Sequence, residues 1–171
     1  EYDGKWRKAT SKTFTIPVKG GSPIAQTAYY THLGPVISKP DVKAGVAYVG
    51  ATLYLEQSRV FEQAYKMVTS KNIYEFFQAV GIGEFNPQNS MFAEVPGDSG
   101  YVRSGATPIR PDGYDWNRPV PGDTSKTAWK GIHKVEDLVH VFNPPQGYMQ
   151  NCNISPVNMT ANSPMTSEKY K

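Results

Sequence analysis

Residues 142–156 read FNPPQGYMQNCNISP, and this composition excludes both an α-helix and an uninterrupted β-strand. Proline removes a backbone donor and fixes φ, glycine adopts conformations that other residues avoid, and asparagine hydrogen-bonds its own backbone in turns. Such a segment holds its side chains in fixed places. The chain is therefore expected to fold around one long ordered loop, whose exposed side chains are candidates for function.

Length and charge limit the rest of the molecule. The 171 residues, 39% of them apolar, are enough for one domain with a real core. The 18 basic and 15 acidic residues leave a net charge of +3 that is spread along the chain, so the field is weak and nucleic acid is not an expected partner. No apolar run approaches the roughly 20 residues of a membrane span, and no signal peptide is recognisable, so no membrane partner is expected.

The chain holds one cysteine, Cys152, so no internal disulfide supports the fold. A thiolate becomes a nucleophile where a base or a helix dipole lowers its pKa, but a lone cysteine is more often a buried, inert apolar group, and this is our interpretation of Cys152. The first residue is Glu1 rather than methionine and lies in an apparent hairpin. We expect an excised or processed piece.

The first third of the chain predicts β structure. Asp3-Gly4 is a dipeptide favoured in two-residue hairpin turns. Residues 13–18 alternate in polarity, 20–22 form a turn and 24–31 are rich in β-forming residues, which predicts an antiparallel hairpin. Residues 46–55 (VAYVGATLYL) are mostly apolar and predict a strand buried on both faces.

Two short helices follow. Residues 59–69 have helical spacing, with one apolar side made of Val60, Ala64, Met67 and Val68. Asn72 is a predicted N-cap with Glu75 three residues later, and Gly81 or Gly83 ends the second helix. Its aromatic stripe is interpreted as core packing, and the members of this stripe are Ile73, Phe76, Phe77 and Val80.

Residues 90–95, 96–100 and 101–106 predict strand, turn and strand. The turn contains GDSG, which invites comparison with a serine-protease nucleophile, but His32, His133 and His140 have no local signature of a catalytic base. The flanking strands already explain Gly97 and Gly100 as turn residues. The histidines also lack metal-ligand spacing, so zinc is not expected.

The order of several motifs carries more information than any one of them. They are DGKW at 3–6, THLGPVI at 31–37, Arg59 opening a helix, AEVPGDSGYVRSGATPIR at 93–110, PVPGD at 119–123, WKG at 129–131 and NPPQGYMQNCNISP at 143–156. In this order and at these distances, the chain resembles the penicillin acylase family. The resemblance covers almost all of residues 2–156.

The resemblance implies an N-terminal-nucleophile hydrolase that cleaves the amide bond of acylated small molecules such as β-lactams or acyl-homoserine lactones. In that family the precursor cleaves itself, and the new first residue of the large chain, a serine, cysteine or threonine, attacks while its own α-amine serves as base. An α-amine has a pKa near 8, so a useful share is neutral at working pH. The fold class expected is α+β, mostly antiparallel β with two short helices, as part of an αββα architecture. Residues 1–156 would be a segment of the large chain, and residues 157–171 a tail or linker.

The family pattern GY-x-x-N-x-N-x-S/P uses its second asparagine to donate a side-chain amide to the oxyanion, and here it falls on Asn153. The alternative is an asparagine that merely caps a turn, a role that suits Asn151 better. Cys152 lies at a position that the family does not use for attack, which favours the inert interpretation. The ring of Tyr148 would lie beside the site, and Arg59 is expected to pair with acids.

The chain also departs from the pattern. Leu33 stands where the family often has a histidine, so no role transfers to it or to His32. Glu1 has neither hydroxyl nor thiol, so the nucleophile, the backbone donor of the oxyanion hole and the small acyl-binding chain must lie outside this chain. The expected partners are an acyl amide substrate, the rest of the large chain and the small chain. No cofactor is required, a structural calcium ion is compatible, and the family is commonly periplasmic or secreted.

Two alternatives remain open at the level of sequence. One is a pocket-wall or structural β domain with no chemistry of its own, which the 12% aromatic content and the loop-rich residues 108–131 suit. The other is a free-standing β protein whose resemblance is accidental. Whether it is a segment of the acylase large chain or a pocket-wall domain, the isolated chain is expected to be inactive toward amides.

Overall fold

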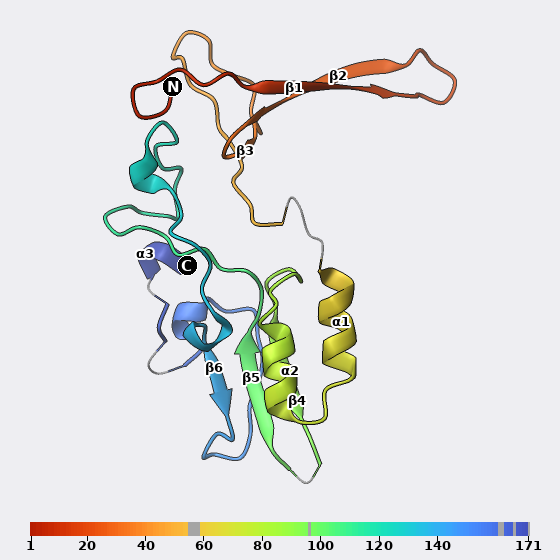
Figure 1. Cartoon of the computed structure of the whole chain (residues 1–171), viewed down its shortest axis with the longest axis vertical. Coiled ribbons are helices and arrows are strands. Elements are labelled where there is room, and N and C mark those ends of the chain that lie inside the picture. Colours follow the sequence, from red (N-terminus) through yellow and green to blue (C-terminus); the bar gives the residue numbers. More distant parts are fainter. Residues whose placement is uncertain (55–58, 96, 161–162, 166, 171) are drawn as a thin grey trace. The chain divides into compact units, whose positions relative to one another are not determined.

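The computed structural model describes residues 1–54, 59–95, 97–160, 163–165 and 167–170. The chain divides into two compact units, one made of Glu1–Thr52 with Pro121–Thr127 and the other of Leu53–Val120 with Ala128–Lys171. Each unit contains one three-stranded antiparallel sheet, and the helices α1 and α2 belong to the second (Figure 1). The predicted α+β class is confirmed.

The first unit is a long β-ribbon with a short third strand. β1 (Thr10–Ile16) pairs with β2 (Ile24–Thr31), which also pairs with β3 (Gly34–Pro35). The predicted hairpin is therefore confirmed. The predicted turn at Asp3-Gly4 is present too, since both residues have positive φ, 47° and 73°, and the flanking residues form a β-bridge.

The predicted strand at 46–55 is wrong for the residues that the structure describes, and residue 55 lies outside them. Val46 and Val49 form only isolated bridges, and the side chains of Val46 and Tyr48 are 51% and 53% exposed. A strand is buried on both faces only where neighbouring strands and covering layers flank it. Within the described part of their unit, residues 46–52 are held by separate backbone hydrogen bonds, such as those from Ile37 N–H to Tyr48 and from Gly50 N–H to Pro35, and not by a continuous ladder.

Two packed helices open the second unit, α1 (Val60–Val68) and α2 (Ile73–Val80). Asn72 caps α2 as predicted, because its Oδ1 accepts from the backbone N–H of Glu75 at 2.8 Å. Gly81 is the C-cap residue, also as predicted. The placement of Val68 on the packed side of α1 is wrong, since this side chain is 82% exposed.

The second sheet has the order β4-β5-β6, with β4 at Asn89–Ala93, β5 at Ser99–Arg103 and β6 at His140–Phe142. Successive residues of a strand point to opposite faces, and both faces of β5 are covered. Val102 packs with Phe77 and Val80 of α2, which confirms the interpretation of the α2 stripe as core. Tyr101 packs in a second cluster with Met165.

Short helices complete the two units. The first unit contains the 3-10 helix η1 (Ser125–Thr127), and the second contains η2 (Val135–Asp137) and η3 (Pro156–Asn158). The four-residue α3 (Ser167–Tyr170) follows near the end of the second unit. Because Met165 is 4% exposed, part of the segment after residue 156 belongs to the core of this unit. The boundary at 156 stays a prediction.

A buried glutamine joins α1 to the chain that follows α2. Gln63 is 1% exposed, and its Oε1 accepts from the backbone N–H groups of Glu84 and Phe85 at 2.7 and 3.1 Å. Its Nε2 donates to the carbonyl of Val80 at 3.4 Å. One side chain thus satisfies three backbone groups where the chain leaves α2 for β4.

Candidate functional site

The loop 143–156 is tethered at its start by Asn143, the residue after β6. The N–H of Ser99 donates to Oδ1 of Asn143 at 2.8 Å, and Nδ2 of Asn143 donates to Oδ1 of Asp98 at 2.9 Å. The backbone of Asn143 has φ +46°, a conformation that asparagine tolerates better than most residues. The side chain of Asn143 therefore fixes the start of the loop to the β4–β5 turn.

The next residues form the rigid approach that the sequence predicts. The N–H of Gly147 donates to the carbonyl of Pro144 at 2.9 Å, which closes a turn, and Gly147 has φ +76°. Glycine takes this conformation without the steric cost that a Cβ brings. Pro144 thus provides the carbonyl that closes the turn, and Gly147 provides the positive φ.

A second tether lies further along the loop. Oδ1 of Asn151 accepts from Nδ2 of Asn89, the first residue of β4, at 3.0 Å. The interpretation of Asn151 as a turn-capping residue is wrong, because its side chain reaches across to the sheet. The loop is thus fixed at both Asn143 and Asn151 to the β4–β5 hairpin.

Asn153 lies just beyond the second tether, at the centre of a tight turn. The N–H of Ile154 donates to the carbonyl of Cys152 at 2.9 Å, so the chain reverses within three residues. Ser155 then caps η3 by accepting from the N–H of Val157 at 3.4 Å. The turn presents the Asn153 side chain at its apex.

The carboxamide of Asn153 is exposed and makes no hydrogen bond to any residue that the structure describes. It is therefore available as a donor, while the backbone on both sides of it is held. This combination, a fixed position and an unused N–H, is what stabilisation of a developing oxyanion requires.

A groove of about 290 Å³ borders this turn. It is lined by residues of the loop, including Tyr148, Met149 and Ile154, and by Tyr101 and Met159 from outside the loop. Cys152 also lines the groove and is exposed, so the expectation that it is buried is wrong for the described residues. The hydroxyl of Tyr101 donates to Sδ of Met159 at 2.7 Å, which joins two of the residues that line the groove.

The GDSG segment has a structural explanation. Residue 96 lies outside the described residues, Gly97 has φ +146°, and Ser99 and Gly100 already belong to β5. The assignment of Gly100 to the turn is therefore wrong. A Cβ at Gly100 would lie 2.3 Å from the ring of Phe92 on β4, so glycine is required there by close packing.

No hydrogen bond in the described part of the chain joins Ser99 to a histidine. Nδ1 of His140 donates to the carbonyl of Leu138 at 2.8 Å, and Nε2 of His133 lies 2.6 Å from the hydroxyl of Tyr170. Asp98, which an acid–base triad would need beside a histidine, instead accepts from Asn143. The arrangement offers no activated serine.

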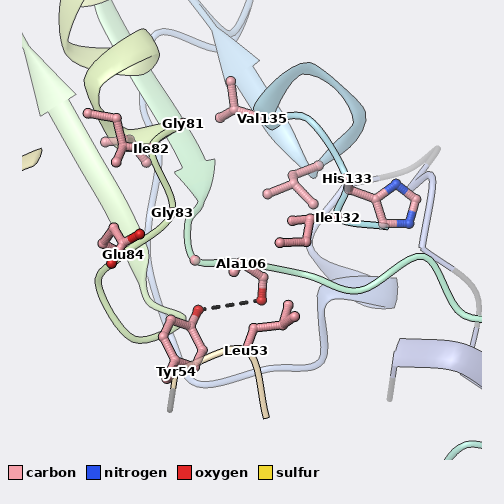
Figure 2. A pocket seen from close by; sticks show the side chains of 13 residues that line it. Leu53, Tyr54, Gly81, Ile82, Gly83, Glu84, Ala106, Ile132, His133 and Val135 are labelled. Carbon is pink, nitrogen blue, oxygen red and sulfur yellow. Dashed lines mark hydrogen bonds between the residues drawn. The ribbon is translucent and has the colours of Figure 1, made fainter. Parts of the chain in front are cut away.

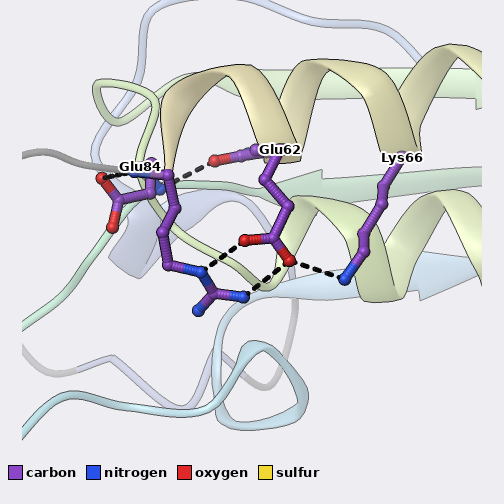
Figure 3. A network of polar contacts seen from close by, with 5 residues as sticks. Glu62, Lys66 and Glu84 are labelled. Carbon is purple, nitrogen blue, oxygen red and sulfur yellow. Dashed lines mark hydrogen bonds and ion pairs between the residues drawn. The ribbon is translucent and has the colours of Figure 1, made fainter.

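Arg59 pairs with an acid, as the sequence predicts. Its Nε lies 2.7 Å from Oε2 of Glu62, and Nζ of Lys66 lies 2.8 Å from the other oxygen of the same carboxylate (Figure 3). Hydrogen bonds from Arg59 and then from Lys66 lower the pKa of Glu62 to about 2. These charges form a network along one side of α1.

A second cavity, of about 100 Å³, lies where the chain leaves α2 (Figure 2). The hydroxyl of Tyr54 donates to the carbonyl of Ala106 at 3.4 Å on its border, and the ring of His133 points away from Ala106. Pockets that bind small molecules usually have volumes of about 300–1,000 Å³. This cavity is too small for an acylated substrate.

The described ranges contain no group of three or more His, Cys, Asp or Glu side chains placed to hold a metal ion. They also contain no helix with the length and apolar character needed to cross a bilayer.

Comparison with known proteins gives consistent matches. The family model described as penicillin amidase matches residues 1–171. Penicillin G acylase of Escherichia coli is 34% identical over 157 residues, which are 91% of this chain and 18% of that protein. The acyl-homoserine lactone acylase QuiP of Pseudomonas putida is 28% identical over 156 residues, 88% of this chain and 18% of that protein.

A solved structure agrees with this picture. The thermostable penicillin G acylase from Alcaligenes faecalis, in orthorhombic form, matches with a TM-score of 0.84 and 26% identity, covering 99% of this chain and 30% of that chain. The chain thus spans less than a fifth of the length of the two curated relatives that it matches.

Proposed function

Because the chain belongs to the penicillin amidase family, we propose that it is the part of an amide-cleaving acylase that supplies the side-chain donor of the oxyanion hole, Asn153. The single observation that carries this proposal is the free carboxamide at the apex of a turn whose preceding backbone is tethered twice to the sheet. The nucleophile and the base, in this proposal, come from polypeptide outside residues 1–171.

The chemistry follows from where charge develops. When a nucleophile attacks an amide carbonyl, the oxygen becomes negatively charged, and a donor already in position stabilises the transition state without reorganisation. A serine, cysteine or threonine at a chain terminus, with its neutral α-amine as base, needs no histidine. This fits a chain whose His133 and His140 are engaged in other hydrogen bonds.

The substrate class that we propose is an acylated small molecule, either a β-lactam or an acyl-homoserine lactone. The names of the E. coli and P. putida relatives support both classes. The groove beside Asn153 supports a secondary role as part of the wall that contacts substrate, because its thioether and aromatic side chains adapt to apolar groups.

The test of the donor role is Asn153→Ala in the full-length parent enzyme. We expect kcat to fall by about 10²–10³-fold, the loss typical of one oxyanion-hole donor, with a much smaller change in KM. Asn86→Ala is the matched control, because Asn86 is an exposed asparagine that does not line the groove. If the Asn153 variant is folded and processed like the wild type and has equal activity, the proposal is refuted.

The groove has a separate test. Met159→Ala in the parent should change kcat/KM between substrates that differ by one acyl methylene, an effect of about 1–3 kcal/mol where a pocket wall is involved. Unchanged selectivity would exclude the wall role and leave the donor role intact.

Three expectations stay predictions: a structural calcium ion, export of the parent protein and inactivity of the isolated chain. Incubation of the isolated chain with a chromogenic acyl amide checks the third.

A further inference from the structure

Helix α1 carries two apolar stripes instead of one. With about 100° between successive residues of a helix, the spacing i, i+4, i+7 aligns Phe61, Tyr65 and Val68 along one side. These three side chains are 89%, 69% and 82% exposed. A surface helix with one partner needs one apolar stripe, and that stripe is already provided by the side that carries buried Gln63 and the half-buried Met67.

The polar residues of α1 occupy only the remaining side. Arg59, Glu62 and Lys66 follow the spacing i, i+3, i+7 and form the ion-pair network along the helix (Figure 3). Roughly one third of the circumference is therefore suited to water, whereas a helix with a single packing partner is polar over most of its surface. The second stripe has the composition of a packed face.

We propose that Phe61, Tyr65 and Val68 form a docking face for an uncharged, apolar segment of the parent polypeptide that lies outside residues 1–171. The proposal rests on the proposed function, since it takes the chain as part of a longer acylase. The matched structure extends well beyond this chain, which covers 30% of it, so ample polypeptide exists to supply the segment. An uncharged partner is favoured because the neighbouring charges of α1 already pair with one another.

The experiment measures side-chain access in the folded parent. Phe61→Cys, Tyr65→Cys and Val68→Cys are each labelled with a small thiol reagent, and the modified peptide is quantified by mass spectrometry so that Cys152 is read separately. Lys66→Cys, on the charged side of the same helix, is the matched control. We expect the three stripe positions to react at least about tenfold more slowly than position 66, because labelling of a covered thiol requires local opening.

Each outcome decides the proposal. Labelling at 61, 65 and 68 as fast as at 66 would overturn it, and protection that disappears on dilution of the protein would assign the face to a second copy and overturn it too. Val68→Cys is a small change at an exposed position, which the fold should tolerate. Hydroxyl-radical labelling of Tyr65 in the unmodified parent gives the same information without a substitution. Because no substrate is involved, slow labelling in a parent that lacks acylase activity would support the docking face while refuting the proposed function.

Discussion

At the scale of single residues, the candidate site depends on asparagines in three different roles. Asn143 holds the β4–β5 turn, Asn151 binds Asn89 of the sheet, and Asn153 is left without a partner among the described residues. An amide can donate and accept at once, so the same residue type serves as tether and as donor. The position of the proposed oxyanion donor, Asn153, thus depends on hydrogen bonds made by two other asparagines.

Asn143 can be tested by substitutions that separate its backbone from its side chain. Asn143→Gly keeps the positive φ but loses the bonds to Ser99 and Asp98, which should lower the free energy of unfolding by about 1–2 kcal/mol. Asn143→Ala should lower it by roughly 1 kcal/mol more, because alanine disfavours a left-handed φ. Denaturant unfolding of the parent checks the order, and equal stability of the two variants would contradict it.

Glu62 gives a pH prediction. Its folded pKa of about 2 lies below the ordinary glutamate value of 4.5, so the ion-pair network stabilises the fold fully above pH 4.5 and this contribution is lost as the pH falls toward 2. A ¹³C NMR titration of the Glu62 carboxyl should show the depressed midpoint. Because Arg59 is the principal cause, Arg59→Ala should raise that midpoint more than Lys66→Ala does. The opposite order would show that the bond to Arg59 is not formed in solution.

At the scale of elements, the helices were predictable and the tethers were not. The cap of α2 joins Asn72 to Glu75, three residues apart, so a local pattern reveals it. The bonds of Asn143 to Ser99 and of Asn151 to Asn89 span 44 and 62 positions. Nothing in a single sequence identifies such partners, although proline, glycine and asparagine did mark the loop as ordered.

Gln63 decides how α1 meets the chain after α2. Gln63→Leu fills a similar volume but leaves the N–H groups of Glu84 and Phe85 without this acceptor, so we expect a loss of about 2–4 kcal/mol in unfolding free energy. Gln78→Leu is the control, because Gln78 is exposed on α2 and its bond to Glu136 should contribute less than about 1 kcal/mol. Similar losses for both variants, measured by denaturant unfolding, would contradict the role of Gln63.

At the scale of the whole molecule, the apolar sequence patterns predicted that two segments are buried, whereas the structure leaves several of their side chains exposed among the described residues. The sequence of residues 46–54 and the second stripe of α1 both have the character of packed surface, yet Val46, Tyr48 and Phe61 are at least half exposed. An apolar sequence pattern indicates that a surface is buried in a packed protein, but it does not identify the polypeptide that buries it. This explains why the fold class could be predicted while the predicted buried strand was wrong.

Hydrogen exchange in the full-length parent tests whether further polypeptide covers residues 46–52. We expect the backbone amides of Ala47, Val49 and Ala51 to exchange with deuterium more slowly in the parent than in the 171-residue polypeptide, since strand pairing would protect N–H groups that have no acceptor among the described residues. Amides of α2 serve as the internal reference, because their helical hydrogen bonds are complete within the segment. Equal exchange of the amides of Ala47, Val49 and Ala51 in both samples would show that no further strand pairs with them.

The second tether has a consequence for how the enzyme would respond to acidity. The contact between Asn89 and Asn151, which holds the turn of Asn153, joins two carboxamides, and neither takes up or releases a proton over the working range. The position of the proposed donor, Asn153, should therefore not depend on pH. A pH–rate profile of Asn153→Ala should be scaled down uniformly and keep its inflection points, because in the proposed mechanism these belong to the attacking chain terminus.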